Sequence, residues 1–288
     1  MNYGITMPPF GAYAEPATLI AAAQAAEAAG WDGFFLWDTV IHDGNFYPVG
    51  EPWTLLAALA MATKRMRLGI MLTPLSRRRP WQVARQAATV DRLSGGRVVF
   101  GAGLGGAEPD FTWFDEEWDA KTRARILDES LDVITALWSG EPVAYAGEHV
   151  RHATAAFLPT PVQRPRIPIW IGGNWPNKAP MRRAARYDGV FPLRGGFDLS
   201  PEELATIKAY IEPLRTSSGP FDYVASGLTP GDAPEAGSKK VAPYAPAGAT
   251  WWLETVDPWS RAGNWSAKLN SAAEAWMETR MGQPPPRV

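Results

Sequence analysis

The sequence contains no cysteine and only three histidines, His42, His149 and His152. Disulfide bonds, thiolate nucleophiles and cysteine-ligated metals are therefore excluded, and the lack of cysteine fits the reducing cytoplasm. His149 and His152 lie close together, but no third ligand stands at a spacing suited to zinc. We therefore expect a cytoplasmic protein that has no metal site.

Long apolar runs and strong charge of one sign are also missing. No apolar stretch approaches the roughly 18 residues that a membrane-spanning helix needs, and the N-terminus lacks a basic-then-apolar signal segment. The formal net charge is -2, and the longest basic run is Arg77 to Arg79. Neither nucleic acid nor a membrane is therefore an expected partner. Apolar residues make up 46% of the chain, which is enough for a buried core.

Short β-branched or aromatic runs alternate with segments of helical length. Strands are expected at residues 3–7, 33–37, 68–72, 98–101, 167–171, 189–192, 223–226 and 250–253. Helices are expected at residues 16–29, 52–63, 80–93, 120–137, 179–187, 201–214 and 271–280, with only a short one between 229 and 248. The pattern predicts an α/β fold, a single (β/α)₈ TIM barrel domain over residues 1–288 with an insertion after strand 4.

Residues 139–166 form this insertion, and they are rich in proline, glycine and isolated aromatic residues. We expect an irregular excursion that lies over the barrel. An open doubly wound sheet is the alternative to the barrel, and its glycine-rich fingerprint follows the first strand. Here Pro8 and Pro9 occupy that place, and proline has no amide to offer a pyrophosphate. The barrel is therefore favoured.

Functional residues of such a barrel lie where strands end and loops begin. Asp38 follows the second strand, where it can serve as a base, as a hydrogen-bonding partner for a cofactor or substrate, or merely as the cap of the next turn. His42 lies in the same loop, either as a proton shuttle near neutral pH or as a solvated loop residue. Both are weak candidates for a catalytic role, and no other catalytic residue can be named.

Glycines mark two further strand ends. Gly172 and Gly173 end the fifth strand ahead of a helix, so that their amides can meet an anionic group such as a phosphate. A tight turn between strand and helix is the alternative explanation. Gly101 and Gly103 follow the fourth strand, where missing side chains leave room for a flat ring unless they only begin a flexible loop.

Several segments, taken together, resemble the bacterial luciferase-like monooxygenase superfamily. They are residues 72–80 (LTPLSRRRP), 84–97 (ARQAATVDRLSGGR), 101–105, 127–131, 137–140, 159–163 and 169–173. The resemblance covers residues 1–195 well and the remainder weakly. It implies a (β/α)₈ barrel that uses either reduced FMN with O₂ or the deazaflavin F420 for hydride transfer. It also implies a homodimer that forms through barrel helices.

The resemblance extends to individual residues. It implies that Gly172, Gly173 and Asn174 lie at the cofactor phosphate, and that Asp38 and the segment from Gly101 to Gly103 border the ring system. A cis peptide bond that does not precede proline is expected around residues 70–72.

This bond would place Ile70 and Met71 against the ring. The chain departs from the sugar-phosphate dehydrogenases of the superfamily, which carry His where Thr39 stands and an acid where Gly106 stands. Chemistry supplied by the cofactor itself is therefore expected. Residues 170–173 and 251–254 look more like the deazaflavin branch, which favours F420 over FMN.

We therefore expect a flavin- or F420-dependent oxidoreductase that transfers a hydride to a small organic substrate or inserts oxygen into it. A flavin reductase or an F420 reductant would supply the electrons. A non-catalytic flavin-binding protein of the same fold is the alternative. A metal-dependent hydrolase is disfavoured because, apart from Asp38, the strand ends lack His and Asp.

Overall fold

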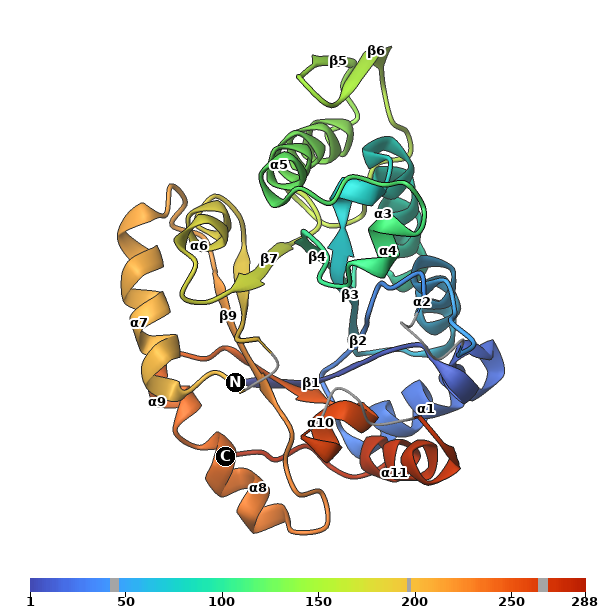
Figure 1. Ribbon diagram of the computed structural model, residues 1–288, viewed down its shortest axis with the longest axis vertical. Coiled ribbons are helices and arrows are strands. Elements are labelled where there is room, and N and C mark those ends of the chain that lie inside the picture. Colours follow the sequence, from blue (N-terminus) through green and yellow to red (C-terminus); the bar gives the residue numbers. More distant parts are fainter. Residues whose placement is uncertain (42–46, 196–197, 264–268) are drawn as a thin grey trace.

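The computed structural model describes residues 1–41, 47–195, 198–263 and 269–288. Eight parallel strands close into a barrel in the order β1-β10-β9-β8-β7-β4-β3-β2 (Figure 1). The strands are β1 (Asn2–Met7), β2 (Gly33–Leu36), β3 (Arg67–Pro74), β4 (Val98–Gly103), β7 (Ile169–Asn174), β8 (Gly189–Leu193), β9 (Asp222–Gly227) and β10 (Trp251–Thr255). The predicted closed barrel is thus confirmed, and each expected strand overlaps an observed one.

Helices surround the barrel. The longer ones are α1 (Pro16–Ala29), α2 (Pro52–Ala62), α3 (Pro80–Ser94), α5 (Ala120–Leu137), α6 (Lys178–Ala184), α7 (Pro201–Ile211), α8 (Pro234–Val241) and α11 (Ser271–Met281). Three short ones, α4 (Pro109–Thr112), α9 (Tyr244–Ala247) and α10 (Pro258–Ala262), lie in connections. Local chemistry sets the helix ends, as at Gly30, whose φ of 97° ends α1 in the left-handed conformation that glycine tolerates. Among the residues described, no helix has the length and apolar content to cross a membrane.

Three aromatic rings fill the inside of the barrel. Phe35, Trp170 and Trp251 come from β2, β7 and β10, and their ring centroids lie 5.4 to 5.9 Å apart. At most 5% of each side chain is exposed. We call these residues the aromatic triad. The triad makes the barrel interior a packed core rather than a channel.

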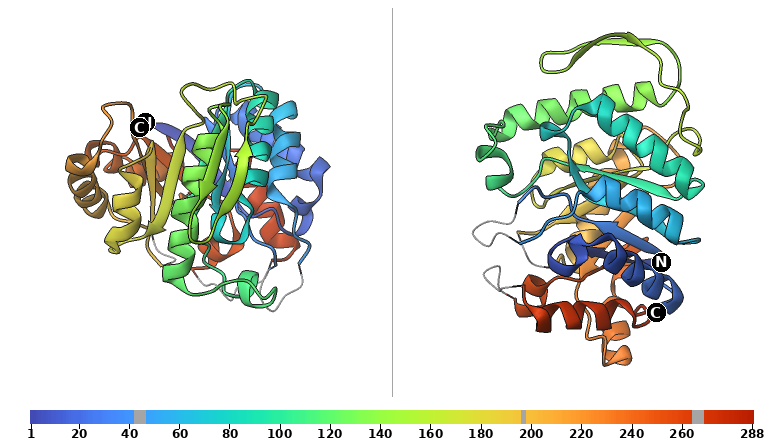
Figure 2. Two further views of the ribbon diagram at one scale, coloured as in Figure 1. Left: turned by 90° about the horizontal axis from the view of Figure 1, so that it is seen from above. Right: turned by 90° about the vertical axis from the view of Figure 1, so that its right-hand side faces the viewer.

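The insertion departs from the prediction. Residues 139–166 are not wholly irregular, because β5 (Val143–Ala146) and β6 (Arg151–Ala155) pair as an antiparallel hairpin. The hairpin also does not lie over the barrel but projects outward beyond α5, away from the barrel centre (Figures 1 and 2). The backbone can form this pair because its half-exposed residues need no second buried face.

A buried ion pair joins the C-terminal helix to the barrel. Glu254 of β10 is fully buried, and Arg280 of α11, 2% exposed, lies with its Nε 3.2 Å from Glu254 Oε1. Thr229 and the Trp252 indole N–H donate further hydrogen bonds to the same carboxylate. Glu254 thus points away from the barrel interior, although its position at the end of the eighth strand suggested the functional rim.

Breaking one side of this pair should destabilise the protein strongly. Arg280→Met would leave a buried, uncompensated carboxylate, and we expect the free energy of unfolding to fall by about 3–5 kcal/mol. The double variant Glu254→Leu/Arg280→Met should recover most of that loss because no charge remains buried. Urea unfolding followed by circular dichroism measures both values. A double variant that is no more stable than Arg280→Met would contradict this explanation.

Candidate functional site

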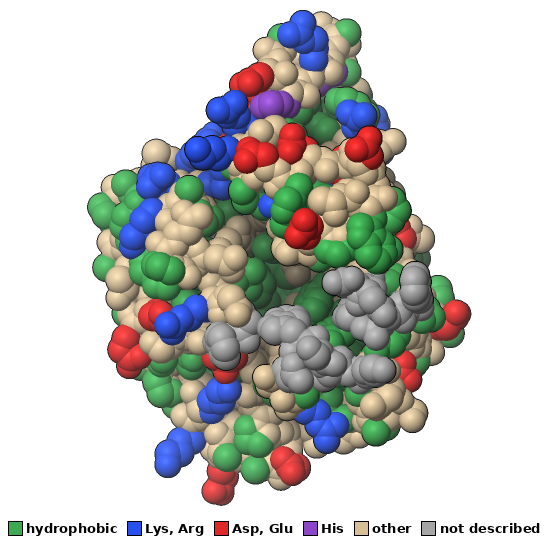
Figure 3. Space-filling view, viewed as in Figure 1, with side chains coloured by type: hydrophobic (Ala, Val, Ile, Leu, Met, Phe, Trp, Pro, Cys, Tyr) green, Lys and Arg blue, Asp and Glu red, His purple; other side chains and the backbone are tan. Residues whose placement is uncertain are grey.

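The carboxyl-terminal ends of the strands meet at one face of the barrel, which we call the mouth. Figure 3 shows a hollow at the centre of this face, with hydrophobic side chains exposed inside it. Catalytic and binding residues of parallel barrels lie at this end, because the loops that follow the strands converge there. The mouth is therefore where the predicted site residues have to be found.

Side chains alternate in direction along a strand, so the inward-facing positions at the mouth follow from the buried interior residues. These interior residues are Phe35, Met71, Val99, Trp170, Phe191, Val224, Trp251 and Leu253. Two residues further along β2, β8, β9 and β10 stand Trp37, Leu193, Ser226 and Thr255. None of these four inward positions carries an ionisable side chain. They were not singled out from the sequence, although strand alternation contains the signal.

One wall of the mouth lacks side chains. Gly101 and Gly103 of β4 and Gly172 of β7 occupy inward positions on two neighbouring, paired strands. A Cβ at Gly101 would collide with the Ile70 carbonyl, and one at Gly103 or Gly172 would collide with the Leu72 side chain. We call these three residues the glycine wall. The half-buried Leu72 side chain therefore lies against it, and any flat ring at this wall would also contact Leu72.

The peptide bond between Met71 and Leu72 is cis, where the resemblance placed one. Met71 points into the barrel interior and is 5% exposed. Ile70 faces the other way, because its fully buried side chain belongs to the core between strands and helices. Only the backbone of Ile70 can therefore border the mouth. The roles of Ile70 and Met71 at a ring stay predictions.

The end of β7 differs from the expected strand-to-helix turn. Gly173 faces outward, where a Cβ would collide with Pro180, so helix packing explains its lack of a side chain. Helix α6 begins only at Lys178, and its Ala179 amide is already capped by the Asn177 side chain. The helix end is therefore less open to an anion than the sequence suggested.

Two groups remain for an anion at this end of the mouth. Asn174 is exposed at the end of β7, and Lys178 follows in the first turn of α6. The Lys178 ammonium lies 3.7 Å from the centroid of the Trp175 ring, and no ion pair joins it to a described carboxylate. Figure 3 shows Lys and Arg side chains along this edge of the face, over α6.

An aromatic wall lies on the other side of the mouth. Trp37 projects inward after β2, and its indole N–H donates to Thr6 Oγ1 of β1 over 3.0 Å. Its ring stacks on Trp259, with centroids 6.2 Å apart and planes inclined by 25°. Phe10 meets the edge of Trp259 at 6.0 Å. Trp259 and Phe10 are each only 3% exposed, so they support Trp37, whose ring is the part of this wall that a flat or apolar group could contact.

Asp38 is held by two arginines. Arg77 Nη2 lies 2.9 Å from Asp38 Oδ1, and Arg78 Nε lies 2.7 Å from Asp38 Oδ2. The Asp38 side chain is 1% exposed, and Arg78 also reaches Glu51. Asp110 of α4 lies 3.6 Å from Arg77 and accepts hydrogen bonds from the Val40 and Ile41 amides.

We call Asp38, Glu51, Arg77, Arg78 and Asp110 the rim network. It ties the loops after β2, β3 and β4 together and takes up both oxygens of Asp38. The arrangement favours an anchoring role for Asp38 over that of a base, and its contact with a cofactor stays a prediction. His42, the other catalytic candidate, lies outside the described residues.

Charge and burial compete within the rim network. Burial raises the pKa of the Asp110 carboxyl above its ordinary value, although the Ile41 and Val40 amides and Arg77 act in the opposite direction. Burial also opposes the charge of Arg78, but Asp38 and Glu51 outweigh it and raise the pKa of the guanidinium. The ion pairs therefore favour the charged form of Arg78, whereas burial makes Asp110 easier to protonate than an exposed aspartate.

This raised pKa predicts a pH dependence with a definite sign. The folded protein binds the Asp110 proton more tightly than the unfolded chain, so ionisation costs stability as the pH rises above about 4 and through the raised pKa. We expect the free energy of unfolding of the wild type, minus that of Asp110→Asn, to fall over this range. Urea unfolding at a series of pH values measures the difference.

Asp119→Asn is the matched control. Hydrogen bonds from the Thr122 amide and hydroxyl lower the pKa of Asp119, which caps α5. For this exposed residue the same difference should therefore rise as the pH increases to about 4, the ordinary aspartate value, and change little above it. Curves of the same sign for both variants would refute the assignment.

Comparisons with known proteins identify the family of the chain. The family model for luciferase-like monooxygenase matches residues 1–279. An F420-dependent glucose-6-phosphate dehydrogenase from Microbacterium testaceum is 36% identical over 177 residues, which are 60% of this chain and 51% of that protein. The chain thus spans about half the length of this relative.

Solved structures share the fold at low sequence identity. The F420-dependent tetrahydromethanopterin reductase from Methanopyrus kandleri has a TM-score of 0.73 at 18% identity, covering 99% of this chain and 98% of that one. The oxygenating constituent of 3,6-diketocamphane monooxygenase from Pseudomonas putida, in complex with FMN, has a TM-score of 0.64 at 19% identity, covering 79% and 67%. The family model spans nearly the whole chain, and the chain therefore belongs to the luciferase-like monooxygenase family.

Proposed function

We propose that this protein is an oxidoreductase that binds F420 or FMN in the mouth of the barrel and acts on a small organic substrate there. The observation that carries the proposal is the glycine wall facing the aromatic wall across an apolar hollow. The names of its relatives support both cofactors, because they include F420-dependent enzymes and a monooxygenase in complex with FMN. F420 is the first choice, since the F420-dependent dehydrogenases are the more similar in sequence.

The residues of the mouth fit such a cofactor. Gly101, Gly103 and Gly172 add no side chain of their own on two adjacent strands, so a planar tricyclic ring at this wall would lie against the Leu72 and Met71 side chains that cover them. Leu72 and Met71 would contact the ring from β3. The anionic tail would lie toward Asn174 and Lys178, where a half-buried ammonium group has no carboxylate partner among the described residues.

The bound ring would supply the hydride or oxygen chemistry, and the chain would position the reactants. Trp37, held by Thr6 and Trp259, would form the apolar side of the substrate space and exclude water from it. Ser226 and Thr255 would offer hydroxyl groups for hydrogen bonds to the substrate. The rim network would fix the surrounding loops through its buried ion pairs.

The substrate proposed here is a small organic molecule and not specifically glucose 6-phosphate. Thr39 and Gly106 stand where sugar-phosphate dehydrogenases of the superfamily carry His and an acid. The inward positions Trp37, Leu193, Ser226 and Thr255 bring no charge to a sugar phosphate. A flavin reductase or an F420 reductant would provide the electrons.

Titration with each cofactor tests the proposal. We expect saturable quenching of tryptophan fluorescence by F420 or by FMN, because the Trp37 indole lies at the mouth and stacks on Trp259. Gly103→Ala should weaken this binding about tenfold, because its methyl group would push the Leu72 side chain off the glycine wall toward the space of the ring. Gly106→Ala is the matched control, because open space surrounds its Cβ, and it should bind like the wild type.

The outcomes separate the two functional readings. Binding together with turnover of alcohol, aldehyde or ketone substrates supports the oxidoreductase. If a cofactor binds but none of these alcohols, aldehydes or ketones is converted, the non-catalytic flavin-binding protein is favoured instead. If neither cofactor binds, the proposal is wrong.

We further infer that the protein forms a homodimer through α2. This helix is rich in alanine, and its Met61 is 61% exposed. Apolar exposure on a helix that allows close approach favours contact with a second copy.

Sedimentation should show twice the 31.5 kDa chain mass, and Met61→Glu should yield monomer. Leu158→Glu, at a residue 68% exposed in the insertion, should stay dimeric. A monomeric wild type would refute the inference.

A further inference from the structure

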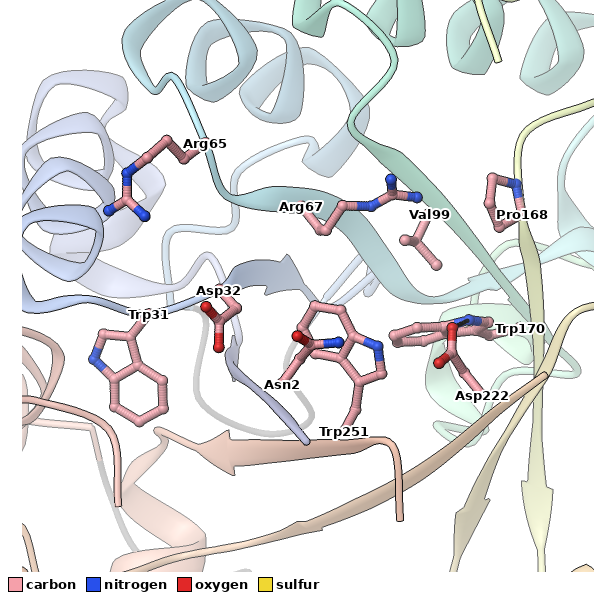
Figure 4. Close-up of a pocket in the computed structure, with 10 residues that line it drawn as sticks. All are labelled: Asn2, Trp31, Asp32, Arg65, Arg67, Val99, Pro168, Trp170, Asp222 and Trp251. Atoms are coloured by element: carbon pink, nitrogen blue, oxygen red, sulfur yellow. Dashed lines mark hydrogen bonds between the residues drawn. The ribbon is translucent and has the colours of Figure 1, made fainter. Parts of the chain in front are cut away.

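A second cavity lies at the opposite end of the barrel from the mouth. It has a volume of about 430 Å³, which falls within the range of small-molecule sites. Residues at the amino-terminal ends of the strands surround it, among them Asn2, Arg67, Asp222 and Trp251 (Figure 4). The aromatic triad lies between this amino-terminal cavity and the mouth, so the cavity is not a part of the cofactor site.

Arg67 brings an incompletely paired cation to this cavity. It is the first residue of β3, and its Nη2 donates to the Val98 carbonyl and the Gln163 side chain. Its Nε and Nη1 have no hydrogen-bond partner in the described parts of the chain, and no carboxylate there lies within ion-pair distance. A guanidinium stays charged and presents N–H groups as a planar fork that matches a carboxylate.

Arg97, on the same end of the barrel, shows what a purely structural arginine looks like here. Its Nε donates to the Ser94 carbonyl, and its Nη1 and Nη2 donate to Thr63, Met66 and Ala60. All three nitrogens of Arg97 are therefore used within the fold. Arg67 differs because its Nε and Nη1 have no such partner in the described parts of the chain, and because the residue lines the cavity.

The other lining groups define the complementary chemistry. The Asp222 carboxylate is fixed by the Thr250 hydroxyl at 2.8 Å and the Trp170 indole N–H at 3.1 Å. Asp32 accepts from the Tyr3 amide and from Arg287. Carboxylate oxygens have further lone pairs for an ammonium group. Trp251 offers an indole for the apolar part of a ligand.

We propose that the amino-terminal cavity binds a small zwitterion of the amino-acid type. Arg67 would hold the ligand carboxylate, and Asp222 and Asp32 would face its ammonium group. This site is independent of the cofactor in the mouth, and it does not rest on the proposed function.

NMR spectra of the ¹⁵N-labelled full chain test the proposal through the indole signals of Trp170 and Trp251, assigned with Trp→Phe variants. The probes are glycine, leucine and phenylalanine, with acetate and ethylamine as partial ligands. We expect saturable shifts with at least one amino acid below about 20 mM, and binding about tenfold weaker for acetate and ethylamine. Shifts of indoles in the mouth, such as that of Trp37, should stay small.

Arg67→Met should abolish these shifts, whereas Arg151→Met, at an exposed residue of the β5–β6 hairpin, should leave them unchanged. If the wild type shows no saturable shift with any amino acid, the proposal is overturned whether or not Arg67→Met folds. If acetate binds as tightly as the amino acids, the ligand is not recognised as a zwitterion and the proposal is wrong. If a folded Arg67→Met binds the amino acids as tightly as the wild type, Arg67 does not hold the ligand carboxylate. Cofactor titration of the same samples reports separately on the mouth.

Discussion

The packing of Phe35, Trp170 and Trp251 inside the barrel divides the molecule into two chemically different ends. The three rings come from strands that are far apart in sequence, and they leave no continuous channel between the ends. The apolar mouth can therefore hold a planar cofactor away from water. The amino-terminal cavity can meanwhile keep charged groups such as Arg67 and Asp222 near its own opening.

The charged side chains at the two ends of the barrel differ in whether they are paired. At the mouth, the rim network neutralises Asp38 with two arginines and keeps it buried, so the charges serve to hold loops together. At the other end, Arg67 has no carboxylate within ion-pair distance among the residues described. Buried charges that are paired stabilise geometry, whereas a charge left partly unpaired is available for a ligand. The two ends therefore differ in that the ionisable side chains of the rim network near the mouth are paired, whereas Arg67 at the cavity has no ion-pair partner among the described residues.

Much of the barrel could be predicted from the sequence because its strands are short apolar runs punctuated by glycine and proline. The β5–β6 hairpin could not, since its half-exposed residues carry no apolar periodicity. Gly101, Gly103 and Gly172 could be singled out because a missing side chain at a strand end is visible in sequence, although Gly172 was expected at a phosphate and not beside Gly101 and Gly103. The contact of Leu72 with these glycines could not be predicted, because it depends on the register of β3 against β4. Asp38 was found as a candidate, but its pairing with Arg77 and Arg78 depends on how the loops pack.

The alternation of side chains along a strand also explains why neighbouring residues face opposite sides of the barrel wall and make different contacts. Glu254 faces outward and binds Arg280 of the last helix, whereas Thr255 faces the mouth. Trp170 fills the barrel, while its indole N–H reaches Asp222 in the amino-terminal cavity. Two residues further along the same strand, Gly172 borders the mouth. Strand β7 therefore contributes residues to both ends of the barrel, with Trp170 at the amino-terminal cavity and Gly172 at the mouth.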